Sequence, residues 1–353
     1  PAANDMATES PIALMDLTVI LRIRFISCSL IRSPANPANR SNRPMYAVFM
    51  PGLSTAPTIF TADQSGNSLE AMIREIPNYT FSEGQGKQSA DGVSGSKVDN
   101  GPVRWRGVAD LQQVFEGGNN DDNAANFGFI LSPPDTIGDV GKDHYVQMFN
   151  LATEIFDKSG NTVLGPFPTS AFFAGMEGNC AISDDGDPIV IYDEETDRWL
   201  VSQFLASFQD GLCIAISTTG DPTGTYHQYE FDFTGIGFPD YPKFGFATDA
   251  VSVMVNLFTP FQGSALGAID KNEMLSGGPA TMVLFTGGER AELAFGWVPA
   301  DNDGPVFDNL LPTFFTGPPF FFDALIVAEI TPDWAAPENS GLGFDFIPVT
   351  PYD

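Results

Sequence analysis

Three stretches decide the fold because they can be laid over one another: PDTIGDV at Pro134–Val140, GDPIVIY at Gly186–Tyr192 and PDYPKFGF at Pro239–Phe246. Each combines proline and aspartate with a short apolar run, and an aspartate then opens a second run. These opening aspartates are spaced 54 and 52 residues apart: Asp143, Asp197 and Asp249. Short apolar runs separated by turn residues, repeated about every 50 residues, indicate β-sheet repeats.

Each repeat supplies about four strands and no helical period. The second strands are expected at His144–Asn150, Arg198–Phe204 and Ala250–Phe258. A single four-stranded sheet cannot bury both of its faces alone, so neighbouring repeats must cover it. The sequence therefore predicts an all-β fold, a β-propeller with four-stranded blades of about 50 residues.

Outside the repeats the sequence changes character. Residues 107–353 are expected to form the blades. Residues 46–106 are rich in Gly, Ser and Asn and are expected to be a linker or a loosely structured N-terminal extension. Residues 1–45 are expected to be a disordered leader or a sequence artefact, with no standard signal peptide. The apolar run Ile12–Ile31 is too interrupted by charged residues to span a membrane.

Charge separates the same regions. The net charge of the chain is −29, and residues 107–353 hold 6 basic and 36 acidic residues. A surface this negative repels phosphate backbones, which disfavours nucleic acid as a partner. Two interpretations remain open: a solvated acidic surface that keeps the protein soluble, or specific Ca²⁺ sites among the carboxylates.

Cysteine usage adds one possible crosslink. The three cysteines do not have the spacing of a zinc site. Cys180 and Cys213 fall within one repeat, where neighbouring strands could bring them together in a disulfide. The alternative is two buried free thiols.

Several of these motifs occur together in one known group of proteins. The strings PPDTIGDVG with HYVQ, GDPIV with RW and SQF, CIAIS, and PDYPK resemble exported bacterial β-propeller-like proteins whose function is not established. The resemblance covers about residues 115–353. It implies the fold and an extracellular or cell-surface location, and no activity. Members of that group continue past the point that matches Asp353, so we expect the propeller to be incomplete at its C-terminal end.

The strongest candidates for chemistry are three aspartates next to the first strands: Asp139, Asp187 and Asp240. First strands of a propeller line the central channel, so these carboxylates are expected to meet at one channel mouth. They could bind Ca²⁺ or divide acid and base roles on a glycoside. The alternative is that each caps its own turn.

Four further polar residues are candidates for ligand binding: His144, Arg198, Tyr241 and Lys243. Structural hydrogen bonds or salt bridges to the abundant acids are the alternative. Two acidic turns have oxygen ligands and a glycine as calcium loops do, although neither has the full EF-hand pattern. Their candidate metal ligands are Asp184, Asp185 and Asp187 in one turn and Asp301 and Asp303 in the other.

No strong catalytic motif is present, since neither a nucleophile elbow nor a Cys/His arrangement occurs. We therefore expect an exported, non-enzymatic propeller that binds a polysaccharide or a cell-surface protein, with Ca²⁺ as a stabilising ion. Two alternatives stay open: a glycoside hydrolase or lyase that uses the channel carboxylates, and a structural repeat segment of an adhesin. The sequence does not determine the oligomeric state.

Overall fold

The computed structural model describes residues 57–62, 65–68, 114–258, 262–286, 296–302, 310–317 and 324–350. The chain divides into two units, residues 1–49 and 50–353, and every described residue belongs to the second. The expected leader, residues 1–45, lies outside the described residues.

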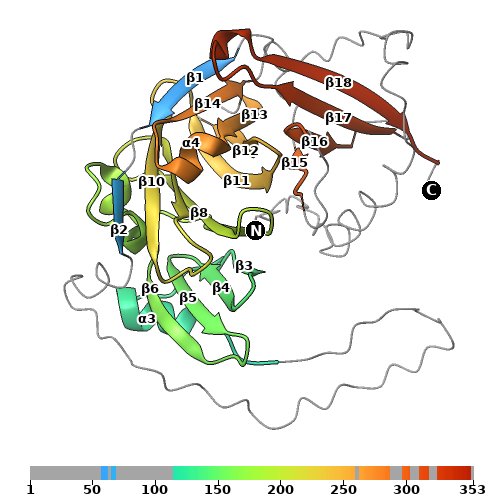
Figure 1. The fold of residues 1–353 in the computed structure, drawn as a ribbon. Helices are drawn as coiled ribbons and strands as arrows, with labels where there is room; N and C mark the ends of the chain where they lie inside the picture. The colour runs from blue at the N-terminus through green and yellow to red at the C-terminus, as the bar shows by residue number, and fades with distance from the viewer. Residues whose placement is uncertain are drawn as a thin grey trace, which may run out of the picture. The chain divides into compact units, whose positions relative to one another are not determined.

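The described chain is all-β, with four antiparallel sheets that follow one another along the sequence (Figure 1). Each sheet is a meander, in which consecutive strands are neighbours. Sheet I contains β3 (Ile137–Val140), β4 (His144–Phe149), β5 (Ala152–Asp157) and β6 (Thr162–Pro168). Sheet II contains β7 (Ile189–Asp193), β8 (Arg198–Leu205), β9 (Gly211–Ser217) and β10 (Thr225–Asp232).

The other two sheets repeat this order. Sheet III contains β11 (Phe238–Phe246), β12 (Ala250–Phe258), β13 (Gly263–Asp270) and β14 (Ala280–Phe285). Sheet IV contains β15 (Val298–Pro299), β16 (Thr313–Thr316), β17 (Ala324–Thr331) and β18 (Gly341–Pro348). The short helices are α3 (Asn120–Phe127), α4 (Lys271–Ser276) and the 3₁₀ turns η2 (Thr169–Phe173), η3 (Asn179–Ala181) and η5 (Pro337–Asn339).

Two strands from the N-terminal side complete sheets II and III. β1 (Thr58–Ala62) pairs with β14, and β2 (Ser65–Ser68) pairs with β10. This part of the expected linker at 46–106 is therefore ordered as strand, which corrects the prediction for these residues. The physical reason is that the outermost strands of both sheets offer free backbone groups, which a short segment can satisfy whether it is mixed, as in TIFTA of β1, or polar, as in SGNS of β2.

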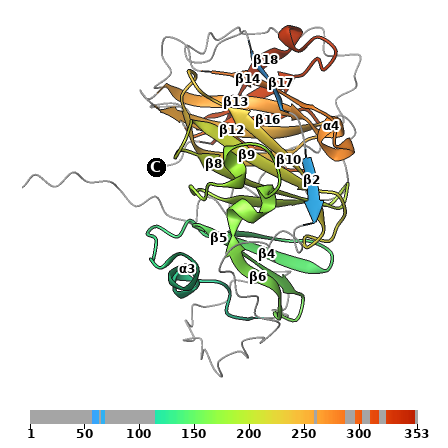
Figure 2. The same cartoon turned by 90° about the vertical axis from the view of Figure 1, so that its left-hand side faces the viewer.

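The first strands of successive sheets contact one another, β3 with β7, β7 with β11 and β11 with β15. Figure 2 shows the sheets stacked in chain order from sheet I to sheet IV. Three apolar cores fill the spaces between successive sheets, and Trp199, Tyr229 and Trp297 are each fully buried in one of them.

This stacking explains why the strands in the middle lack polar alternation. In β12 the sequence AVSVMVNLF is buried at every position but the last, because sheet III is covered on both faces. Even Ser252 is fully buried there.

Candidate functional site

Three residues with left-handed backbone conformation mark one end of sheets I to III. Asp135, Asp187 and Tyr241 have φ values of 42°, 44° and 52°. The first two lie two residues before β3 and β7, and Tyr241 lies at the irregularity in β11 between Asp240 and Lys243. Such conformations cost about 1–3 kcal/mol each in non-glycine residues and often occur at functional sites.

Asn150, at the end of β4, joins the first two of these positions. Its Nδ2 donates to Oδ2 of Asp135 at 2.6 Å and to the carbonyl of Pro133 at 3.2 Å. Its Oδ1 accepts from the backbone N–H of Asp187 at 3.0 Å. Gly186 lies against the same amide with a φ of 127°, so a side chain at position 186 would be strained. The amide thus fixes the turns of sheets I and II relative to each other.

Asp187 reaches across to sheet III. Its Oδ2 accepts from the backbone N–H of Tyr241 at 3.1 Å, and its carboxyl group interacts electrostatically with that of Asp240. Burial, followed by the negative charges of Asp240 and Asp135, raises the pKa of Asp187 to about 6. Burial also raises the pKa of Asp240.

Tyr241 and Lys243 complete the cluster. The Nζ atom of Lys243 lies 3.0 Å from the centre of the Tyr241 ring, a cation–π contact. Burial lowers the pKa of Lys243 to about 8, against the opposing effect of Asp187 and Asp240. The Tyr241 side chain is 50% exposed, so the ring remains open to a ligand. We refer to Asp135, Asp187, Asp240, Tyr241 and Lys243 as the loop-end cluster.

Asp139 lies away from this cluster, which corrects its predicted place beside Asp187 and Asp240. It is inside β3, where Oδ1 accepts from the backbone N–H of Val140 at 2.8 Å and Oδ2 from that of Tyr192 at 2.9 Å. Laying the three repeats over one another predicted a start for the first strand of sheet I that is too late, because β3 already begins at Ile137. The counterpart of Asp187 is Asp135, four residues earlier.

His144 and Arg198 lie at the opposite end of their sheets from the loop-end cluster. His144 opens β4, at the end where Val140 pairs with Tyr145, whereas Ile137 at the cluster end pairs with Met148. Arg198 opens β8, and its guanidinium donates to the carbonyls of Thr196 and Asp197. Of the four predicted ligand-binding residues, only Tyr241 and Lys243 come together.

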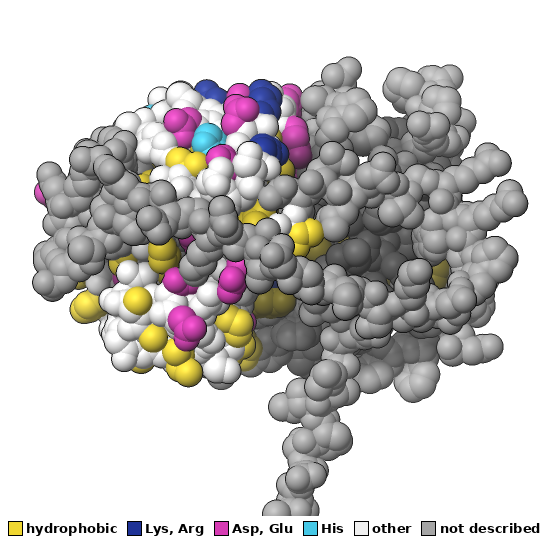
Figure 3. Space-filling view, turned by 90° about the horizontal axis from the view of Figure 1, so that it is seen from below, with side chains coloured by type: hydrophobic (Ala, Val, Ile, Leu, Met, Phe, Trp, Pro, Cys, Tyr) yellow, Lys and Arg dark blue, Asp and Glu magenta, His cyan; other side chains and the backbone are white. Residues whose placement is uncertain are grey.

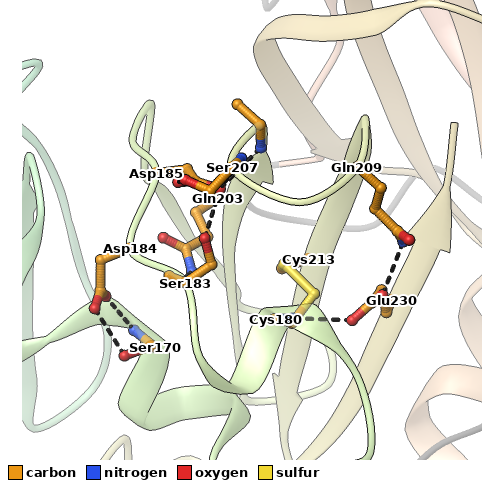
Figure 4. The surroundings of a disulfide bond; sticks show 11 residues. Ser170, Cys180, Ser183, Asp184, Asp185, Gln203, Ser207, Gln209, Cys213 and Glu230 are labelled. Atoms are coloured by element: carbon orange, nitrogen blue, oxygen red, sulfur yellow. Dashed lines mark hydrogen bonds between the residues drawn. A yellow bond between two sulfur atoms is a disulfide. The ribbon is translucent and has the colours of Figure 1, made fainter. Parts of the chain in front are cut away.

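The acidic turn at residues 184–187 does not act as one unit. Asp184 accepts from the N–H and hydroxyl of Ser170 at 2.6 and 2.9 Å (Figure 4). Asp185 accepts from Ser183, Ala206 and Ser207, while Asp187 belongs to the loop-end cluster.

The carboxylates of the first predicted calcium turn, Asp184, Asp185 and Asp187, therefore have separate partners. In the other acidic turn, Asp301 accepts from the N–H of Phe246, and Asp303 lies outside the described residues. Within the described ranges, no three acidic, histidine or cysteine side chains gather in a metal-binding arrangement. Stabilisation by calcium stays a prediction, supported by the net charge of the sequence.

Cys180 and Cys213 form a disulfide between η3 and β9 (Figure 4). Both side chains are fully buried. The N–H of Cys180 donates to Oε2 of Glu230 at 2.9 Å, and Gln209 donates to the other carboxylate oxygen at 3.0 Å. The two cysteines thus hold the segment before β7 against the middle of sheet II.

Sequence reasoning missed Asp135 and Asn150. A closer comparison of Pro134-Asp135-Thr136 with Gly186-Asp187-Pro188 would have found the aspartate. Asn150 had no such signal, because its role depends on the end of β4 meeting the turn before β7.

Comparison with protein-family models, with curated proteins and with solved structures gives no significant match. Among the described residues, no helix has the length and apolar character that crossing a membrane requires.

Proposed function

We propose that sheets I to IV are successive blades of an extracellular β-propeller that binds a polysaccharide at the loop-end cluster. The blade interpretation is supported by the meander order of every sheet and by the contacts between consecutive first strands. The buried disulfide supports an extracellular location, because oxidising compartments favour such bonds.

The observation that carries the binding proposal is the half-exposed ring of Tyr241 beside the Asp187–Asp240 pair. An aromatic ring offers a flat apolar surface to the C–H face of a sugar, while carboxylates and Lys243 exchange hydrogen bonds with its hydroxyls. A few convergent polar groups next to an aromatic surface are typical of small-ligand sites.

Two further exposed aromatic side chains lie in segments at the same end of the sheets. Phe129, in the segment before Asp135, is 49% exposed, and Phe208, after β8, is 61% exposed. Both segments lie at the cluster end of their sheets. On the face seen in Figure 3, the visible acidic side chains of the described residues lie among hydrophobic and other polar ones.

The hydrolase alternative is less well supported. Retaining and inverting glycosidases hold their two carboxyl groups about 5–5.5 Å and about 6.5–9.5 Å apart, respectively. Asp187 and Asp240 interact electrostatically, and the sequence has no catalytic motif beside them.

The test is retention of the chain on a panel of insoluble and soluble polysaccharides. Tyr241→Ala and Asp240→Asn should each weaken binding at least tenfold, about 1.4 kcal/mol. Asp143→Asn is the matched control, because it makes the same change in the exposed turn between β3 and β4, at the opposite end of sheet I.

Two outcomes would count against the proposal. If no polysaccharide retains the chain, or if both cluster variants bind like the parent, the loop-end cluster is not a binding site. Release of reducing ends that Asp240→Asn abolishes would favour the hydrolase alternative. A purely structural repeat would show neither binding nor release.

A further inference from the structure

The outermost strands of the four sheets differ in whether their free edge is paired, protected by proline or left open. An outermost strand leaves one row of backbone N–H and C=O groups without a neighbouring strand. In sheets II and III this row is paired, because β2 lies against β10 and β1 lies against β14. Antiparallel addition of a fifth strand is thus an established mode of contact in this molecule.

The outermost strand of sheet I, β6, is unsuited to such pairing. It contains Pro166 and Pro168, which lack the N–H donor that a ladder needs. Gly165, directly before Pro166, has a φ of 112°, and the register with β5 shifts twice. Irregularity and proline are common protections of sheet edges.

The outermost strand of sheet IV, β18, has neither protection. It pairs with β17 over all eight residues without a shift, and its only proline is the last residue, Pro348. Within the described residues no strand lies on its other side. Phe346 and Ile347 are 39% and 43% exposed, and Figure 1 shows β18 outside β17 at the edge of the sheet. A long, regular, apolar edge of this kind is suited to pair with another strand.

We infer that β18 pairs antiparallel with β18 of a second copy of this chain, with Phe344 on the two-fold axis. This inference does not depend on the proposed function. In this register Leu342 faces Phe346 of the second copy, and the two Phe344 side chains face each other. Asp345, the only charged residue of the strand, faces Gly343, so no like charges meet.

The same register extends an apolar core that already exists. Leu342 and Phe344 pack against the core between sheets III and IV, and the Phe344 ring lies 6.2 Å from that of Trp297. Pairing of two copies would place a second Phe344 beside the first on this face. A two-fold contact also closes on itself, so it yields a dimer and no filament.

The first experiment measures the dimer dissociation constant of the full chain by sedimentation equilibrium. Phe346→Lys places two charges opposite Leu342 in the dimer and should weaken it at least tenfold. Val163→Lys is the matched control, since Val163 is 42% exposed on β6, the edge strand that proline already protects. It should leave the constant unchanged.

The second experiment tests the register by oxidative cross-linking on a Cys28→Ser background, which leaves only the native disulfide pair. Phe344→Cys brings two thiols together on the axis and should give a covalent dimer. Asp345→Cys should not, because diagonal neighbours lie about 7–8 Å apart, beyond disulfide reach.

The inference is overturned if the parent chain is monomeric at every concentration, which would leave a strand of another polypeptide as the occupant of β18. It is also overturned if Phe346→Lys and Val163→Lys dimerise like the parent, or if cross-linking is equal at positions 344 and 345.

Discussion

Asp184 and Asp187 lie three residues apart, and both have a pKa of about 6, yet the causes differ. The pKa of Asp184 is raised mainly by burial, and its carboxylate accepts hydrogen bonds from Ser170. Asp187 is half-buried, and its pKa is raised by burial together with the negative charges of Asp240 and Asp135. The comparison shows that one acidic turn can hold a structural carboxyl group and a site carboxyl group side by side.

Gly186 lies between Asp184 and Asp187 and directs their side chains to different parts of the molecule. Its φ of 127° turns the backbone, so that Asp184 and Asp185 point to η2 and the turn after β8, while Asp187 points to sheet III. Changes on the side before Gly186 should therefore affect stability, and changes on the side after it should affect the site.

The largest effect is expected from the disulfide that holds the segment before Gly186. Removing it in Cys180→Ala/Cys213→Ala opens a loop with a sequence separation of 33. The free energy of unfolding should fall by about 3–4 kcal/mol, measured by urea denaturation. Cys28→Ser, which leaves the disulfide intact, is the control. A loss below about 1 kcal/mol would mean that this segment is held by other contacts.

Asp184 is expected to give the next largest effect. Its folded pKa is raised, so the native state binds more protons than the unfolded state between about pH 4 and pH 6, and stability falls as pH rises through this range. Asp184→Asn mimics the protonated carboxyl group. It should flatten this slope and raise stability at pH 7 by on the order of 2 kcal/mol.

The measurement is the free energy of unfolding at pH 4, 5, 6 and 7 for the parent and the variant. Asp185→Asn is the contrasting control, because hydrogen bonds from Ala206, Ser183 and Ser207 lower the pKa of Asp185 despite its burial. That variant should lose stability at pH 7. Parallel curves for the parent and Asp184→Asn would show that Asp184 is not the group responsible.

The Asp240→Asn variant tests whether the pKa values of Asp184 and Asp187 have different causes. Removing the charge of Asp240 should lower the pKa of Asp187, because that charge contributes to its rise, and should leave the pKa of Asp184 unchanged. Solvent screens this half-buried pair, so the change corresponds to about 1 kcal/mol or less. Carbon-13 NMR titration of the carboxyl groups measures the pKa values of Asp184 and Asp187 in the parent and the variant. Equal shifts in Asp184 and Asp187 would refute the distinction.

Much of the fold followed from the sequence, because the repeat aspartates Asp143, Asp197 and Asp249 recur at nearly constant spacing. The start of each first strand was less certain. Strand β3 begins at Ile137, so Asp139 was assigned to the site in place of Asp135. Local pattern does not determine register to within a few residues, since every aspartate near a turn is equally plausible.

The site itself depended on contacts between sheets, which no local pattern encodes. Asn150 and Tyr241 meet Asp187 across more than 35 and 50 residues, respectively. The strands β1 and β2 were missed for a similar reason. β1 is short and β2, SGNS, is polar, and both become strands by pairing with the edges of β14 and β10.

The smallest effect is expected from the backbone of Tyr241, whose φ of 52° lies in the left-handed region. Tyr241→Gly and Tyr241→Ala both remove the ring, and therefore the contact with Lys243, but only glycine adopts this φ without a penalty. An alanine in the left-handed region costs roughly 1–2 kcal/mol, which favours the glycine variant. The greater conformational freedom of glycine in the unfolded chain offsets about half of that difference. We therefore expect the glycine variant to be the more stable of the two by about 0.5 kcal/mol in paired urea melts. Both variants should lose polysaccharide binding to the same extent, because the ring is absent from each. If alanine were as stable as glycine, the left-handed turn would not be maintained in solution, and the placement of the Tyr241 N–H against Asp187 would have to be abandoned.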